Sequence, residues 1–321
     1  MENTIHIIKE LFIYFYPLII LLGIIGNALS FFVFSSRKFR NTLFYVLFRV
    51  ISITDTIAIV APLHYFLTFG FSFDITQLSN VTCKLVDYVI YTSCPISSYI
   101  LVYVSFDRML NILKPNGFLP KLVVKKFHFS FSILIILFNM IYYAPILVYK
   151  QLEESISYNN ETNKTVATYF CVYKDNGFIY WMDLFYSTII PFIFMFIFTS
   201  VTIFTLFKSK KRTVGINSRD AKFALTSITL NICFFLFVFP LTLFLLISLY
   251  MNINEQTFEL LFIILLSIFS INYANMFYVN MFVNSIFRSS FLDLVKRILR
   301  KFGYKIVIIQ STSAIYTISH R

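Results

Sequence analysis

The chain has 321 residues, of which 58% are hydrophobic and only 13% are charged. A soluble fold of this size could not bury that much apolar surface, whereas a lipid bilayer accepts it. The formal net charge is +12, and because basic residues that face anionic lipid account for such an excess, it does not indicate nucleic acid as a partner.

Seven long apolar runs fill most of the sequence. A bilayer core about 30 Å thick needs roughly 20 apolar residues per crossing helix, and the backbone in hydrocarbon must satisfy its own hydrogen bonds, so each run is predicted to be a helix. Spans are expected at about residues 11–35, 43–70, 81–113, 122–149, 178–207, 221–251 and 256–284. The first run lacks a basic leader and is too long for a cleaved signal peptide. These features predict one all-α, seven-helix membrane domain over residues 1–303, followed by a tail over residues 304–321.

The basic residues lie mostly on one side of the predicted membrane. An odd number of spans places the two ends on opposite sides, and the side that is rich in Lys and Arg is cytoplasmic. The loops after the first, third and fifth spans, together with the inner span ends and the C-terminal region, hold 22 of the 27 Lys and Arg. We therefore expect a multi-pass protein of the plasma membrane with an extracellular N-terminus and a cytoplasmic C-terminus.

Glycosylation sequons and cysteines agree with this orientation. Three sequons begin in the predicted outer loops, at Asn80, Asn160 and Asn163. Of the four cysteines, Cys94 and Cys233 lie within spans, where a small buried side chain is expected. Cys83 and Cys171 lie outside, in an oxidising compartment. We predict a Cys83–Cys171 disulfide that pulls the loop between the fourth and fifth spans over the bundle.

The third span ends in an adjacent acid and base, Asp107 and Arg108. Arg108 follows Cys83 by 25 residues, and a helix of that length covers roughly 37 Å, enough to reach the inner headgroup level. A cysteine, an acid-arginine pair and a later proline, Pro115, at this spacing resemble the rhodopsin-like (class A) G-protein-coupled receptors, which carry Asp-Arg-Tyr here.

Further motifs stand in the family's order along nearly the whole chain. They are Gly26-Asn27 in the first helix, Asp55 in the second, Pro191 and Pro240 in the fifth and sixth, and Phe287-Arg288 after the seventh. The two prolines are expected to kink their helices. The resemblance implies a receptor that binds an extracellular ligand and activates a heterotrimeric G protein.

Several positions depart from the family pattern. Met109 follows the arginine where tyrosine is usual, and Val238 stands where the sixth helix usually has tryptophan. The sequence MFYVN, residues 276–280, replaces the family's Asn-Pro-x-x-Tyr. These departures put the usual activation switches in doubt and resemble a divergent invertebrate type of peptide receptor.

The resemblance also assigns roles to polar residues in the spans. Asp107 is implied to hold Arg108 at rest and to release it toward the G protein, whereas an isolated arginine at this place would simply extend its side chain to the membrane interface. Asp55 is implied to bind a sodium ion or water, with the partners Ser97, Asn272 and Asn275. The alternative is a hydrogen-bonded structural aspartate, because a single carboxylate holds a cation weakly.

The ligand is predicted to be a peptide. Amine receptors of the family carry an aspartate where this chain has Ile90, so a small amine is disfavoured. Eleven of the 15 acidic residues are expected outside, which favours a basic, neuropeptide-like peptide. The alternative is that these acids only solvate the loops. Expected contacts are Asp87, Tyr91 and the outer acids Glu153, Glu154, Asp175, Asp183, Glu255 and Glu259.

The end of the chain and the competing functions complete the prediction. Residues 286–302 repeat apolar positions at helical spacing and carry basic residues on the other side, so they are expected to form an amphipathic helix on the inner leaflet. The alternatives are a transporter or a structural seven-helix protein without G-protein coupling. A transporter is disfavoured because the chain has only seven glycines and shows no internal repeat. The four histidines are scattered, so neither an enzyme nor a metal site is expected.

Overall fold

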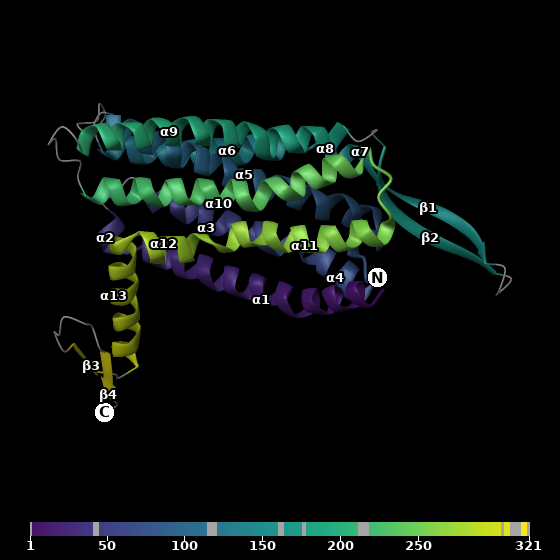
Figure 1. Cartoon of the computed structure of the whole chain (residues 1–321), viewed down its shortest axis with the longest axis horizontal. Helices are drawn as coiled ribbons and strands as arrows, with labels where there is room; N and C mark the ends of the chain where they lie inside the picture. The colour runs from purple at the N-terminus through teal and green to yellow at the C-terminus, as the bar shows by residue number, and fades with distance from the viewer. Residues whose placement is uncertain are drawn as a thin grey trace.

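The computed structural model describes residues 2–40, 45–113, 121–159, 164–174, 178–210, 218–302, 305–308 and 316–319. Within these residues, seven helical segments are long and apolar enough to cross a membrane: His6–Phe34, Tyr45–Phe71, Asn80–Leu113, Phe127–Tyr149, Trp181–Lys208, Lys222–Ser248 and Glu255–Ala274. They run side by side in one elongated bundle (Figure 1). The predicted all-α bundle of seven spans is confirmed.

The first three spans are α1 (Glu2–Phe34), α3 (Tyr45–Val60) with α4 (Leu63–Phe71), and α5 (Asn80–Leu113). Two short elements connect them, namely α2 (Arg37–Arg40) and the 3-10 turn η1 (Ile75–Gln77). The second span is interrupted before α4 because Pro62 has no N–H to continue the helical ladder. Helix α1 begins well before the predicted residue 11, and an ion pair of 2.7 Å between Lys9 Nζ and Glu259 Oε1 fixes this polar extension to α11.

The fourth and fifth spans flank a β-hairpin. Helix α6 (Lys121–Tyr142) continues as the single turn α7 (Ile146–Tyr149), and α8 (Phe178–Asp183) continues through the π-helical turn η2 (Leu184–Ile189) into α9 (Ile190–Lys210). Between them β1 (Lys150–Asn159) pairs antiparallel with β2 (Lys164–Tyr173). From the sequence, only a loop was expected here. The hairpin projects from the end of the bundle at which α1 begins (Figure 1).

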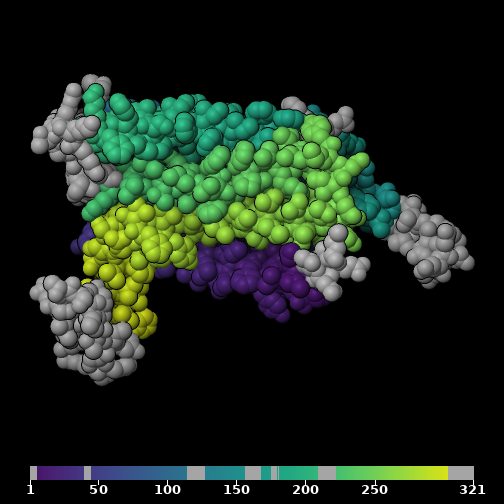
Figure 2. All heavy atoms as spheres, viewed as in Figure 1, coloured from purple at the N-terminus to yellow at the C-terminus, as the bar shows by residue number. Residues whose placement is uncertain are grey.

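The last spans are α10 (Ser218–Ser248) and α11 (Glu255–Ala274), which continues after a break at Asn275 as α12 (Met276–Val283). Helix α13 (Ser285–Lys301) follows and turns away from the bundle at the end opposite the hairpin (Figures 1 and 2). Two short strands, β3 (Lys305–Ile308) and β4 (Tyr316–Ser319), pair antiparallel beyond it. The helix expected after the seventh span is confirmed.

The two expected proline kinks take different forms. Immediately before Pro191, the N–H of Ile190 donates to the carbonyl of Phe185, five residues earlier, which is the π-helical pattern of η2. A proline cannot donate to the carbonyl four residues before it and its ring crowds that carbonyl, so the widened turn accommodates Pro191. Pro240 lies within the continuous helix α10, which bends toward the end of the bundle that carries the hairpin (Figure 1).

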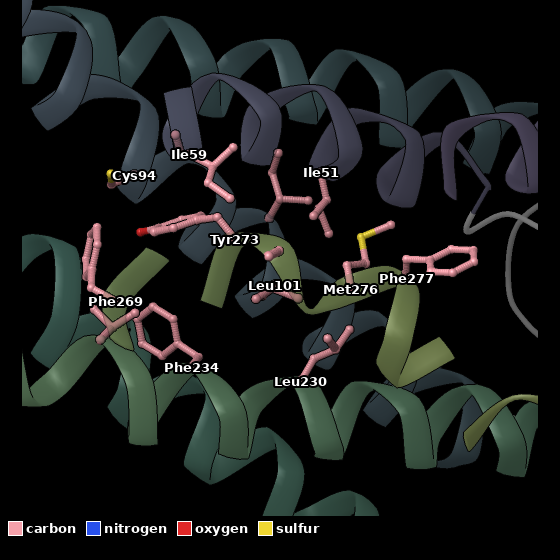
Figure 3. Close-up of a cluster of buried hydrophobic side chains, with 14 of the residues drawn as sticks. Ile51, Ile59, Cys94, Leu101, Leu230, Phe234, Phe269, Tyr273, Met276 and Phe277 are labelled. Atoms are coloured by element: carbon pink, nitrogen blue, oxygen red, sulfur yellow. The ribbon is translucent and has the colours of Figure 1, made fainter. Parts of the chain in front are cut away.

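Buried side chains of α1, α3, α5, α9, α10, α11 and α12 contribute to the core between the spans, and Figure 3 shows part of this core. The labelled members are Ile51 and Ile59 of α3, Cys94 and Leu101 of α5, Leu230 and Phe234 of α10, Phe269 and Tyr273 of α11, and Met276 and Phe277 of α12. Helix α1 packs closely against α3 at Gly23, where an added Cβ would lie 2.3 Å from Cδ1 of Ile59. Asn27 Nδ2 donates to the carbonyl of Tyr273 at 3.0 Å and joins α1 to α11 near the break in the seventh span.

Helix α13 is fixed at both its start and its side. The Asn284 side chain accepts hydrogen bonds from the N–H groups of Ile286 and Phe287, which caps the helix. Lys38 Nζ, between the first two spans, lies 2.7 Å from Asp293 Oδ2. The hydrogen bond from Lys38 lowers the pKa of Asp293. These contacts hold the amphipathic helix against the end of the bundle opposite the hairpin.

Candidate functional site

The predicted Cys83–Cys171 disulfide is confirmed. It joins the first turns of α5 to strand β2 across a sequence separation of 88 residues, with the Cα atoms 5.6 Å apart. At the same end, Asn80 begins α5 and its Oδ1 accepts a hydrogen bond of 3.4 Å from the N–H of Leu152 in β1. Both strands of the hairpin are therefore attached to α5. The other two predicted sequons, at Asn160 and Asn163, lie outside the described residues.

A buried ion pair fixes the base of the hairpin. Nζ of Lys150, the first residue of β1, contacts Oδ2 of Asp87 on α5, and each side chain exposes only 7% of its surface. Tyr173, which faces Lys150 across the hairpin, donates from its hydroxyl to Asp87 Oδ2 at 3.2 Å. Asp87, an expected ligand contact, thus already has a cationic partner inside the chain.

A large outer cavity lies between the hairpin and the ends of the spans. Its volume is about 640 Å³. Asp87 and Tyr91, the expected ligand contacts, both line it, together with Asp74 and aromatic residues of α4 and α11. Asp74 Oδ1 accepts hydrogen bonds from Thr76, at 2.8 Å from its N–H and 2.7 Å from its hydroxyl, so this carboxylate also caps η1.

A smaller cavity of about 70 Å³ lies deeper in the bundle. The two cavities are adjacent, since they share four lining residues: Tyr65, Tyr91, Leu245 and Phe262. The described residues that line the inner cavity are mainly apolar and aromatic, and they include one carboxylate, that of Asp183. Asp183 was expected among the outer acids that contact the ligand; it lies near the start of the span Trp181–Lys208 and lines the inner cavity.

Asp183 has hydrogen-bond partners but no basic partner among the residues that the structure describes. The hydroxyl of Tyr143 donates to Asp183 Oδ1 at 2.9 Å. No described Lys, Arg or His comes within ion-pair distance of the carboxylate. A carboxylate in an apolar cavity is costly unless a cation or water joins it, so the inner cavity favours a positively charged group.

Four polar residues expected to act together do meet in the middle of the bundle. Asp55, Ser97, Asn272 and Asn275 line one cavity of about 10 Å³, which is about the least space that holds a single water. The side chain of Asn275 has a buried Nδ2 without a hydrogen-bond partner. One carboxylate with hydroxyl and amide oxygens is a donor set that fits a small monovalent cation or a water.

At the opposite end from the hairpin, Asp107 and Arg108 are buried rather than exposed at the helix end. Arg108 is 2% and Asp107 is 8% exposed, and Arg108 Nη2 lies 3.4 Å from Asp107 Oδ2. Asn111 Nδ2 also donates to Asp107 Oδ2 at 2.9 Å. The Arg108 guanidinium lies 5.7 Å from the ring centroid of Phe223 on α10. The arginine therefore connects the third and sixth spans.

Two polar residues near this pair were not recognised in the sequence. His128 of α6 places Nε2 3.6 Å from Asp107 Oδ1, and its Nδ1 lies 2.5 Å from the hydroxyl of Tyr103. Asn231 of α10 donates to Ser105 Oγ and to Thr199 Oγ1, each at 2.8 Å. A lone histidine and a lone asparagine in apolar spans were the available signal, since buried polar groups in a membrane need partners.

Comparison with known proteins agrees with this arrangement. Residues 26–284 match the 7 transmembrane receptor (rhodopsin family). Neuropeptide Y receptor type 1 of Xenopus laevis is 27% identical over 159 residues, which cover 49% of this chain and 42% of that receptor. The similar segment thus spans less than half the length of that relative. The invertebrate character suggested by the sequence stays a prediction.

Proposed function

Because the chain belongs to the rhodopsin family of seven-transmembrane receptors, a non-enzymatic family that signals through G proteins, we propose that its ligand is a basic peptide. Membership of this family decides against the transporter and structural alternatives. The similarity to a neuropeptide Y receptor supports a peptide ligand. We further propose that the hairpin end is extracellular and the α13 end cytoplasmic in the plasma membrane, in agreement with the distribution of basic residues.

The observation that carries the ligand proposal is Asp183 in the inner cavity. The carboxylate has no basic partner among the described residues, and the aromatic side chains around the cavity add rings that attract cations. A cavity of about 70 Å³ admits one side chain, whereas the outer cavity of about 640 Å³ has room for several residues. A peptide therefore fits with one Arg or Lys side chain inserted toward Asp183 and the rest under the hairpin.

Paired peptides test this proposal. A library of short amidated peptides would be screened on cells that express the full-length chain, with G-protein dissociation as the readout, and each active arginine peptide would be compared with its citrulline analogue. Loss of one partner from a buried charge pair costs about 2–5 kcal/mol, so Asp183→Asn should weaken an arginine peptide by roughly 30-fold or more.

A control distinguishes the carboxylate of Asp183 from the other acidic residues near the cavities. Asp74→Asn alters an acid that lines only the outer cavity, and it should change potency much less because the basic side chain is proposed to reach Asp183 in the inner cavity. The citrulline analogue should have the same potency on the wild-type receptor and on the Asp183→Asn receptor. Equal potency of the arginine and citrulline peptides on the wild-type receptor would contradict the proposal.

Coupling to the G protein is proposed to act through Arg108. Its contact with Asp107 is long, at 3.4 Å, and its guanidinium lies near Phe223 of α10, so an outward movement of the inner part of α10 would remove part of its surroundings. Pro240 lies within α10 and provides a place for such a movement. Arg108→Ala should abolish stimulated nucleotide exchange while the protein still reaches the cell surface. Arg37→Ala, at an exposed residue of the same end, is the control that should signal normally.

The Asp55 cluster is proposed to hold a sodium ion or a water. Asp55 is 5% exposed and Ser97 is 2% exposed, so a bound cation would be screened from solvent and its charge would be matched by the one carboxylate. If a sodium ion binds there, it neutralises Asp55 in the resting arrangement of the spans. Sodium binding to the purified receptor, followed as a rise in Tm with NaCl compared with choline chloride, tests this role.

A further inference from the structure

A groove that serves neither the ligand cavities nor the Arg108 region lies between α1, α3 and α6. Its volume is about 460 Å³. Among the described residues, the lining is hydrophobic or aromatic except for a single charged residue. These residues are Phe31, Tyr45, Val46, Arg49, Val50, Ile53 and Phe129. Ile53 is 51% exposed and Phe129 is 55% exposed. Since these two residues belong to membrane spans, the groove opens toward the bilayer.

Arg49 is the charged residue of this groove, and only part of its guanidinium group has an interaction partner. The guanidinium carbon lies 4.6 Å from the centroid of the Phe31 ring. Its Nε is buried and has no hydrogen-bond partner. Among the described residues, no acid forms an ion pair with Arg49. The charged side chain of Arg49, inside a membrane span, therefore has one ring contact and one N–H donor without a partner.

The depth of Arg49 makes this arrangement costly. On α3, Arg49 precedes Asp55 by six residues, which corresponds to about 9 Å along the helix axis. Arg49 is also the fifth residue of the span Tyr45–Phe71, so its backbone lies within that span, toward its α13 end. A charged side chain at such a depth pairs with an opposite charge or reaches for the headgroup region.

We propose that this groove is a binding site for one anionic phospholipid of the leaflet at the α13 end. The phosphate of the headgroup accepts hydrogen bonds from the Arg49 guanidinium, whose planar donors match phosphate oxygens in pairs. One acyl chain lies along Val50, Ile53 and Phe129. Anionic lipid is the occupant that this site favours because Arg49 carries the one charge among the described residues of its lining and because anionic lipids concentrate in the cytoplasmic leaflet.

The lipid site is independent of the ligand proposal. The proposed orientation of the chain decides only which leaflet supplies the lipid. The occupant of the site would contact three spans at once, α1 through Phe31, α3 through Arg49 and α6 through Phe129. In a nanodisc that carries the same lipid in both leaflets, binding can be measured without knowledge of the orientation. Failure of the lipid site would therefore leave the peptide and G-protein proposals untouched.

Native mass spectrometry of the full-length receptor released from nanodiscs tests the proposal. The nanodiscs would contain equal amounts of phosphatidylglycerol and phosphatidylcholine of the same acyl length. The wild-type receptor is expected to retain one phosphatidylglycerol in preference to phosphatidylcholine. Arg49→Gln should lower this retention by about tenfold, the effect of losing one charged contact, and Arg49→Lys should keep part of it.

Two further variants separate the groove from general charge attraction. Ile53→Trp keeps Arg49 but fills the path of the acyl chain, and it should also lose the retained lipid. Arg37→Gln removes an exposed arginine from the same end of the bundle and should retain lipid as the wild type does. Equal retention of phosphatidylcholine and phosphatidylglycerol by the wild type, or unchanged retention in both Arg49→Gln and Ile53→Trp, would overturn the proposal.

Discussion

Replacement of Lys150 by methionine is expected to destabilise the receptor far more than an ordinary change at the edge of a membrane protein. Lys150 and Asp87 each expose only 7% of their side chains. Methionine keeps the apolar stem but leaves Asp87 with the 3.2 Å hydrogen bond from the Tyr173 hydroxyl. Breaking a buried pair from one side costs about 3–5 kcal/mol. For a domain of this size, that corresponds to a fall in Tm of roughly 10 °C.

The cysteines of the chain provide a way to measure this fall. Cys83 and Cys171 are joined in the disulfide, so a thiol-reactive fluorophore can react only with Cys94 and Cys233. In a Cys233→Ala background the remaining thiol is Cys94, which is 8% exposed. Its reaction therefore reports the opening of the core between the spans as the purified receptor is heated.

Two comparisons decide whether the buried charge is the cause. The double variant Asp87→Asn with Lys150→Met removes both charges and should recover most of the lost Tm, because no uncompensated charge remains. Lys174→Met changes an exposed lysine directly after the end of β2 and should leave Tm nearly unchanged. The reasoning fails if Lys150→Met behaves like Lys174→Met, or if the double variant is as unstable as Lys150→Met alone.

Three other substitutions should give measurable outcomes. Gly23→Leu should lower Tm, because even a Cβ at this position would lie 2.3 Å from Ile59 Cδ1 and overpacking costs about 1–3 kcal/mol; an unchanged Tm would contradict the close approach of α1. Asp55→Asn should remove any rise in Tm that NaCl produces over choline chloride, and a persistent rise would place sodium elsewhere. Cys171→Ser should destabilise the receptor by about 2–5 kcal/mol, since the disulfide closes a long loop; a reducing agent should have the same effect on the wild type and none on the variant.

The positions of the spans were predictable because the bilayer imposes a minimum apolar length on each helix. The boundaries were less accurate where polar residues extend a helix beyond the apolar run, as in the turns of α1 that include Lys9. The hairpin escaped prediction because a pattern based on hydropathy describes the spans and says little about the segments between them. Its two strands pair mainly with each other, and the disulfide attaches them to α5.

The candidate sites were predictable in unequal measure. The Cys83–Cys171 disulfide was predictable because both cysteines fall in loops expected on the same side of the membrane. The grouping of Asp55 with its three partners followed from a family resemblance that fixes positions along each helix. Asp183 was expected only as one of several outer acids, because which of them faces a cavity inside the bundle depends on how the start of its helix packs. His128 could not be connected to Asp107 from the sequence, since their distance depends on how α5 and α6 are rotated toward each other.

The sequence by itself determined the number of spans, the separation of basic and acidic ends, the disulfide and the family resemblance. Each of these is a property of residues counted along the chain, and the bilayer translates it directly into position. Only the tertiary structure decided that Lys150 neutralises Asp87, that Asp183 faces the inner cavity without a basic partner among the described residues, and that Arg49 keeps an unused donor in a groove toward the lipid. Such pairings depend on the rotation and depth of each helix, which are set by packing between residues far apart in the sequence.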